Sequence, residues 1–98
     1  MIQKTYSKGG RTCRVTFRVR LPGEARNISL CGEFNGWDEA AHPMKRRKDG
    51  SFSVTVALQP GRQYRFRYLI NGERWENDEA ADAYVPNAFG SDDSVVSV

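Results

Sequence analysis

The sequence predicts an all-β chain folded as an antiparallel β-sandwich, and three observations lead to this class. Several segments alternate apolar and polar side chains, as half-buried strands do. Glycine- and proline-containing pairs separate these segments at short, nearly regular spacing, which is typical of a sandwich. No window of useful length has the helical period, and only residues 77–83 could form a short helical turn.

Each expected strand follows from its own alternation of side chains. In order, the strands are residues 13–19, a segment marked by Ile28, Leu30 and Phe34, residues 51–58, residues 63–70 and residues 95–98. Four residue pairs should end or turn these strands: Pro22-Gly23, Asp49-Gly50, Pro60-Gly61 and Asn71-Gly72. The sequence therefore predicts a succession of short strands joined by tight turns.

A chain of 98 residues can build one core, so we expect a single domain over residues 1–98. Residues 1–10 are polar, which predicts a loose N-terminal lead-in without the apolar centre of a signal peptide. The mean hydropathy is negative and no long apolar run occurs, which argues against a membrane span. A start at Met1 without a truncated strand favours a whole gene product.

The two cysteines are expected to be free thiols. Cys13 is in phase with the apolar residues of its strand and should point inward. Cys31 is out of phase with Ile28 and Leu30 and should point outward. Side chains on opposite faces do not meet the geometry of a disulfide, and free thiols suit a reducing compartment. We therefore expect a cytoplasmic protein.

Catalysis and metal binding have little support in the sequence. His42 is the only histidine and stands beside Pro43, with no residue evident to orient it as a base. The spacing of Cys and His fits no metal site, and the clustered carboxylates fit solvated loops better than a calcium site. A domain of this size has little room for a substrate cleft. We expect no enzyme activity, no metal and no cofactor.

Nucleic-acid binding is also disfavoured. The densest basic run, residues 45–48, precedes the turn Asp49-Gly50 and fits a solvated hairpin arm, and the net charge of +3 is mild. Arg65 and Arg67 interleave with aromatic residues, as in some single-strand binders. The alternation places those aromatics on the opposite face from the arginines, so we expect no nucleic-acid partner.

Trp37 and Trp75 are the most informative residues because each follows a turn. Two tryptophans on the loops of a small all-β chain are candidates for a flat apolar platform, which suits the flat faces of sugars. They could instead cover the ends of the sandwich, since tryptophan is often highly but seldom completely buried.

The length of one hairpin loop decides where Trp75 points. A loop of Asn71-Gly72 alone places Trp75 opposite Tyr68, on the core face. A loop of residues 71–73, with a bulge, places it opposite Leu69, on the outward face with Arg67. The residues themselves leave both alternatives open.

Three motifs carry a family resemblance: Gly32-Glu33-Phe34-Asn35-Gly36-Trp37, the segment from Tyr64 to Trp75, and Phe89-Gly90-Ser91 leading into Val95-Val96. They resemble carbohydrate-binding module family 48, the isoamylase-type early-set domains. The chain looks like the glycogen-binding domain of the AMP-activated protein kinase β subunit and the N-terminal domains of branching enzymes and isoamylases. The resemblance covers about Val15 to Val98 and implies an immunoglobulin-like β-sandwich.

The resemblance implies a carbohydrate site made of Trp37, Trp75, Arg67, Phe89, Ser91 and Asp93. Arg67 takes the place of a basic residue that is usually lysine, and Phe89 that of a leucine that threads the sugar ring. Ser91 replaces a threonine, and Asp93 replaces an asparagine with loss of the amide donor. Trp75 matches only if the hairpin carries one extra residue, which favours the longer loop.

The sequence thus predicts non-catalytic binding of α-1,4-glucans, such as glycogen or starch, through the two tryptophans. The alternative is a structural or protein-interaction domain with a degenerate sugar site, docking on a glycan-metabolising enzyme. The row formed by Arg14, Arg18 and Arg20 could serve that docking.

Overall fold

The computed structural model describes residues 1–20 and 25–98, so the expected turn at Pro22-Gly23 lies outside the described residues. Nine strands and one 3-10 turn form in the described part of the chain: β1 (Ile2–Tyr6), β2 (Cys13–Val19), β3 (Ile28–Gly32), η1 (Glu33–Asn35), β4 (Lys45–Arg46), β5 (Phe52–Leu58), β6 (Gln63–Ile70), β7 (Arg74–Glu76), β8 (Ala83–Pro86) and β9 (Asp92–Ser97). No helix of this part has the length and hydrophobicity to cross a lipid bilayer.

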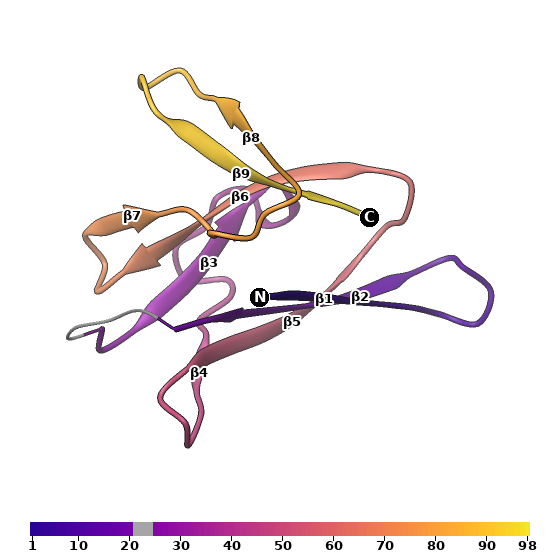
Figure 1. Cartoon of the computed structure of the whole chain (residues 1–98), viewed down its shortest axis with the longest axis horizontal. Coiled ribbons are helices and arrows are strands. Elements are labelled where there is room, and N and C mark those ends of the chain that lie inside the picture. Colours follow the sequence, from indigo (N-terminus) through magenta and orange to yellow (C-terminus); the bar gives the residue numbers. More distant parts are fainter. Residues whose placement is uncertain (21–24) are drawn as a thin grey trace.

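Two antiparallel sheets form the sandwich that the alternation predicted (Figure 1). The first sheet has the strand order β1-β2-β5-β4, and the second has β3-β6-β9-β8, with β7 also pairing with β6. Ladder partners such as Phe17 and Val54, or Leu30 and Tyr68, place apolar residues of neighbouring strands on the same inner side. The all-β sandwich prediction is therefore confirmed.

The core lies between the sheets and consists of the in-phase residues of the strands. Phe17 of β2 packs edge-on against Phe66 of β6, with ring centroids 5.0 Å apart, and Phe66 packs similarly against Tyr68. The Tyr68 hydroxyl donates to the buried Asp78 carboxylate at 2.6 Å, so the polar end of this core ring has a partner. Burial, more than the neighbouring Asp78 charge, raises the pKa of Tyr68.

Several local predictions need correction. Residues 2–6 are not a loose lead-in: they form β1, which pairs with β2 from Ile2–Phe17 through Tyr6–Cys13. Phe34 is not in a strand, because the chain turns into η1 after Gly32. Residues 77–83 form no helical turn, and the strand expected at 95–98 begins earlier, as β9. Strand β8, which precedes β9, was not predicted from the sequence.

Both cysteines are free, as the disulfide argument expected. Both are also buried, although Cys31 was expected to point outward. Cys13 belongs to the core cluster between the sheets. Cys31 pairs with Arg67 on the other side of the second sheet, where its Sγ lies 3.7 Å from the Asp38 carbonyl oxygen. Burial, aided by the Glu39 and Asp38 charges, raises the pKa of Cys31 to about 11, so this thiol stays protonated at neutral pH.

Candidate functional site

An open groove of about 870 Å³ lies on the outer face of the second sheet. Strand β6 contributes its outward arginines, and the loops after η1 and β8 supply the two sides. Its lining residues are Glu33, Trp37, Glu39, Arg65, Arg67, Trp75, Asn87, Ala88, Phe89 and Asp93. The structure thus brings five of the six predicted site residues around one hollow, and the sixth, Ser91, lies beside it in the β8–β9 turn.

Trp75 reaches the groove because the β6–β7 hairpin has the longer loop. Leu69 pairs with Trp75 and Ile70 pairs with Arg74, which leaves residues 71–73 in the loop. Asn71 and Gly72 both have positive φ, as a tight hairpin turn requires, and the Glu73 N–H donates to the Ile70 carbonyl at 3.1 Å. Trp75 is therefore on the outward face, with 37% of its surface exposed.

Trp37 reaches the same groove from the other side, through the turn that follows β3. Gly36 adopts a left-handed conformation with φ of 65°, and Trp37 follows with φ of 60°. The Trp37 N–H donates to the Gly32 carbonyl at 2.9 Å, and the indole is half-buried. A bulky residue in this region of φ is uncommon and strained, and such strain concentrates at functional positions.

Gly32 allows this turn to approach the sheet closely. A Cβ at this position would lie 2.6 Å from the Arg65 carbonyl oxygen and 2.8 Å from the Phe34 ring. Any larger residue would therefore push the turn away from β6.

Arg67 lies beside Trp75, with its guanidinium carbon 5.9 Å from the indole centroid. Its Nε is shielded from solvent and has no hydrogen-bond partner, and no ion pair of Arg67 is found among residues 1–20 and 25–98. The side chain is thus held near the ring while its charge and donors remain uncommitted to the protein.

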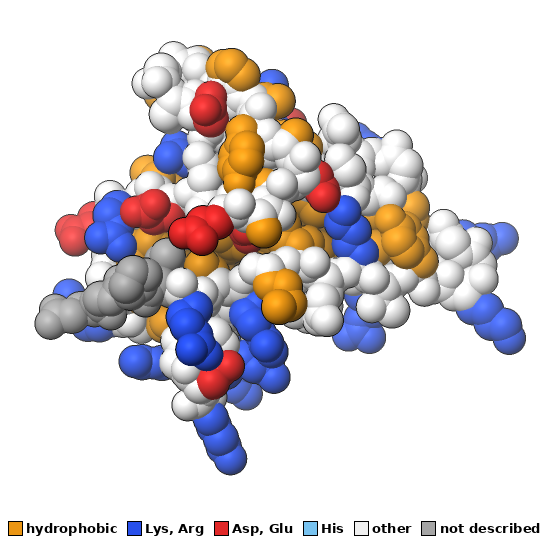
Figure 2. Space-filling view, viewed as in Figure 1, with side chains coloured by type: hydrophobic (Ala, Val, Ile, Leu, Met, Phe, Trp, Pro, Cys, Tyr) orange, Lys and Arg blue, Asp and Glu red, His pale blue; other side chains and the backbone are white. Residues whose placement is uncertain are grey.

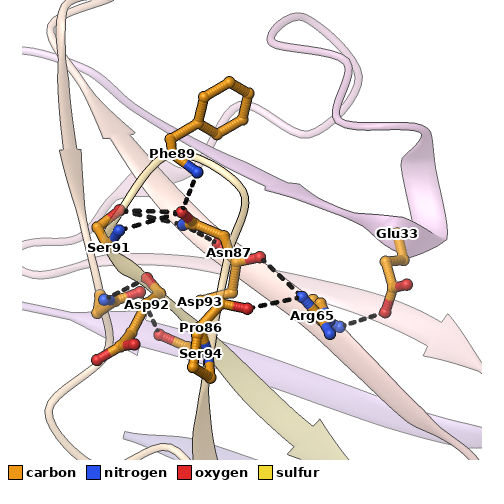
Figure 3. Close-up of polar contacts among 10 residues, drawn as sticks. Glu33, Arg65, Pro86, Asn87, Phe89, Ser91, Asp92, Asp93 and Ser94 are labelled. Carbon is orange, nitrogen blue, oxygen red and sulfur yellow. Dashed lines mark hydrogen bonds and ion pairs between the residues drawn. The ribbon is translucent and has the colours of Figure 1, made fainter.

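Arg65, two residues earlier on the same face, is instead committed to the protein (Figure 3). Its Nη1 donates to the Pro86 carbonyl at 3.3 Å and lies 3.8 Å from an Asp93 carboxylate oxygen. Its backbone N–H donates to Glu33 at 2.7 Å. The alternation placed Arg65 on this face, but its role was missed because its partners come from β8, β9 and η1, which are distant in sequence.

Asn87 organises the β8–β9 turn and was also missed (Figure 3). Its Oδ1 accepts from the backbone N–H groups of Phe89 and Ser91, at 2.9 and 3.2 Å, and its Nδ2 donates to Asp93 at 3.1 Å. An asparagine directly after proline is a recognisable turn signal that could have identified it. This network holds Phe89 at the tip of the turn, with 93% of its surface exposed and its ring pointing away from the polar contacts.

The groove is mixed in charge, since two arginines and three carboxylates line it. Asp93 is buried and shared between Asn87 and Arg65, so its acceptor capacity is partly used. In the described part of the chain, no three His, Cys, Asp or Glu side chains come together as a metal site would require. Three aromatic rings and one uncommitted guanidinium are suited to a neutral ligand with hydroxyl groups.

A small antiparallel sandwich with an aromatic-lined groove on one outer face has the architecture expected of a carbohydrate-binding module. Residues 5–85 match the family model of carbohydrate-binding module 48, the isoamylase N-terminal domain, and the chain belongs to this family. The predicted membership of this family is therefore confirmed, and the matched residues include the first two of the three sequence motifs.

Among curated relatives, a 1,4-alpha-glucan branching enzyme GlgB of Pseudomonas syringae pv. tomato is 44% identical over 57 residues, which cover 56% of this chain and 8% of the enzyme. The enzyme of the same name from Deinococcus radiodurans is 35% identical over 71 residues, covering 71% of this chain and 10% of the enzyme. Protein PTST homolog 2, chloroplastic, from Arabidopsis thaliana is 30% identical over 78 residues, which cover 78% of this chain and 14% of that protein. The chain thus spans only about a tenth of the length of these relatives.

Proposed function

We propose that this chain is a single, non-catalytic module that binds α-1,4-glucans in the groove of the second sheet. The observation that carries the proposal is that Trp37 and Trp75 line one groove in a member of a carbohydrate-binding family. Each indole would stack on the C–H face of a glucose ring. By analogy with bases stacked on aromatic side chains, such a contact contributes on the order of 1–3 kcal/mol.

The remaining predicted residues would fix the register of the glucan. Arg67 would donate to sugar hydroxyls, and the protruding ring of Phe89 would enter the curve of the chain. Asp93 would accept from a hydroxyl with the lone pairs that Asn87 and Arg65 leave free, and Ser91 would act from the rim. The site is open, so few ligand groups would be fully desolvated and binding would be weak.

The curvature of the ligand follows from the same arrangement. Two rings carried by different elements on the two sides of a hollow suit a curved α-1,4-glucan better than a flat β-1,4-glucan. We place the module in the cytoplasm, which its two unpaired cysteines support, because free thiols persist in reducing compartments.

The proposal is tested by titrating the 98-residue chain with maltoheptaose and with β-cyclodextrin while tryptophan fluorescence is recorded. Retention on glycogen provides a second readout, and cellohexaose is the matched β-linked control. We expect a saturable fluorescence change with both α-linked ligands and none with cellohexaose. If folded protein neither responds to them nor is retained on glycogen, the interaction-domain alternative is favoured, with the basic outer face of the first sheet as its candidate docking surface.

A further inference from the structure

The turn that presents Trp37 contains two consecutive residues with positive φ, Gly36 and Trp37. Glycine adopts this conformation freely, but tryptophan does not, so contacts around the turn must offset its strain. The main-chain bond from Trp37 to Gly32 closes the turn but does not by itself fix how the turn sits on the sheet. Two side chains do so: Glu33 accepts from the Arg65 N–H of β6 at 2.7 Å, and Asn35 joins the turn to the end of β3.

Asn35 uses its whole amide group to hold the turn. Its Oδ1 accepts from the Gly32 N–H at 3.0 Å, and its Nδ2 donates to the Leu30 carbonyl at 2.9 Å. The same Nδ2 lies 2.8 Å from Nδ1 of His42. Because an amide nitrogen can only donate, the His42 ring nitrogen is the acceptor of this bond. Two of these contacts join the turn to the end of β3, and the third joins it to His42, which follows the turn in the chain.

His42 is itself fixed in place. Its carbonyl accepts from the Leu30 N–H at 3.0 Å, and its ring packs edge-on against Phe34, with centroids 6.2 Å apart at 70°. Phe34 in turn packs against Phe17 and Tyr64 of the core. A continuous series of contacts therefore runs from the core through Phe34 and His42 to the Asn35 amide.

We propose that Asn35, supported by His42, is a positioning residue that sets the orientation of the Trp37 indole over the groove. Neither residue lines the groove, so neither would touch the ligand. The effect on affinity rests on the proposed glucan binding, whereas the effect on the indole does not. A loosened turn leaves Trp37 present but no longer preorganised, which lowers affinity without removing a contact.

The orientation of the indole is tested without any ligand, in a Trp75→Phe background where Trp37 is the only tryptophan. We expect Asn35→Ala to reduce the near-ultraviolet circular dichroism band of the indole strongly. Asn35→Asp, which keeps the acceptor for Gly32 but loses both donors, should reduce it partly. Asn77→Ala is the matched control, because Asn77 is also half-buried and joins two segments, to Asp92 and Ser94, outside the groove.

Affinity is measured with maltoheptaose in the chain that retains Trp75. We expect Asn35→Ala to weaken binding about tenfold, equivalent to about 1.4 kcal/mol, and Asn77→Ala to change it less than about twofold. His42→Asn keeps an acceptor near the position of Nδ1 and should retain affinity, whereas His42→Leu should lose it. If Asn35→Ala fails to fold, the proposal is tested with the two His42 variants and with Asn35→Asp.

Three outcomes would overturn the proposal. An unchanged indole band in Asn35→Ala would show that Asn35 does not orient Trp37. An equal loss of the band in Asn77→Ala would show a general loosening of the fold. Equal affinities of the two His42 variants for maltoheptaose would show that His42 does not help Asn35 to position Trp37. Failure of the unmodified chain to bind maltoheptaose would contradict the proposed function instead, and the ligand-free measurements would still decide the role of Asn35.

Discussion

The chain segments that build the two sheets differ sharply in charge. Residues 1–20 and 44–60, which form the first sheet and its turns, contain ten Lys and Arg but only one Asp, so their net charge is +9. The rest of the chain contains five Arg and eleven Asp and Glu, so its net charge is −6. Figure 2 shows Lys and Arg gathered around the region of β2, β4 and β5. The modest overall charge of +3 conceals this separation.

The two faces also differ in relief and in aromatic content. The described outward side chains of β2 and β5 are small or basic, and the Thr16 and Thr55 hydroxyls bond across the strands at 2.9 Å. A hollow of about 560 Å³ near β4 is lined by Arg18, residues 45–48 and Asp49. The second sheet instead presents a groove with two tryptophans and an exposed phenylalanine. One fold thus carries an aromatic groove on one face and a basic hollow on the other.

The largest expected effect is the loss of glucan binding on removal of either tryptophan. Trp37→Ala or Trp75→Ala should abolish detectable retention on glycogen, because hydroxyl hydrogen bonds contribute only about 0.5–1.5 kcal/mol net each. The domain should remain folded, since neither ring belongs to the core between the sheets. Far-ultraviolet circular dichroism and a urea titration check the fold beside each binding assay. Retention by either folded variant would contradict a site that depends on both rings.

Arg67→Ala should have a smaller effect on the same face. Loss of one hydrogen bond to a sugar hydroxyl corresponds to roughly two- to tenfold weaker binding. Arg74→Ala is the matched control, because Arg74 is exposed on the same hairpin but pairs with Glu76 and does not line the groove. Maltoheptaose titrations of both variants provide the measurement. Equal affinities of the two variants would remove Arg67 from the site.

The sequence predicted the strands but not every residue that shapes the groove. Alternation alone placed Arg65 and Arg67 on the outward face, because side-chain direction in a strand follows from period two. Alternation could not predict the side of the sheet on which Trp75 lies, since one extra residue in the β6–β7 loop moves Trp75 to the opposite face. Only the family resemblance favoured the longer loop that the structure has. The pairing of Arg65 with Asp93 depends on how β8 and β9 meet, which is a long-range outcome that local patterns do not contain.

The N-terminal strand shows a second limit. The few polar and apolar residues of 2–6 carry no strong strand signal, and tertiary contacts decide their conformation. Besides the pairing of β1 with β2, Lys4 donates to Asp82 at 2.8 Å and Tyr6 donates to the Val98 carbonyl at 2.8 Å, so two further contacts of β1 have partners about 80 to 90 residues away. Contacts between residues this far apart cannot be predicted from the pattern of neighbouring residues.

The contact between Lys4 and Asp82 joins the basic sheet to the acidic one and should contribute a small, pH-dependent stability. Partial burial favours the neutral Asp82 carboxyl, but hydrogen bonds from Lys4 and the Ser97 N–H outweigh it and lower the pKa of Asp82 below 3.8. A lowered pKa in the folded state gives stability that is present above the unfolded value and is lost as pH falls through the folded one.

We therefore expect Asp82→Asn to lower the free energy of unfolding at pH 7 by no more than about 1 kcal/mol, because the pair is partly exposed. The difference from the unmodified chain should shrink progressively below pH 3.8. Urea denaturation of both proteins at pH 7 and at several acidic pH values measures it. A difference that stays constant into acid would show that ionisation of Asp82 contributes nothing.

The smallest expected effect concerns the basic face. The combined change Arg14→Ser, Arg18→Ser and Lys45→Ser should alter maltoheptaose affinity less than about twofold, because glucans are neutral and their proposed site lies on the other sheet. Raising the salt concentration should likewise change glucan affinity little. Any binding of a single-stranded oligonucleotide should behave oppositely, with a logarithmic salt slope of about −0.7 per phosphate contact, and should be lost in the triple variant.

These two ligands therefore separate the faces by salt as well as by mutation. Glucan affinity that fell steeply with salt, or that was lost in the triple variant, would mean that the basic sheet takes part in sugar binding. An oligonucleotide could instead bind the triple variant but not Trp75→Ala. That result would place nucleic-acid binding in the aromatic groove, through stacking of bases on the indole. Either result would contradict the assignment of different ligands to the two faces, because the charge and aromatic content of a face would then not predict which ligand it binds.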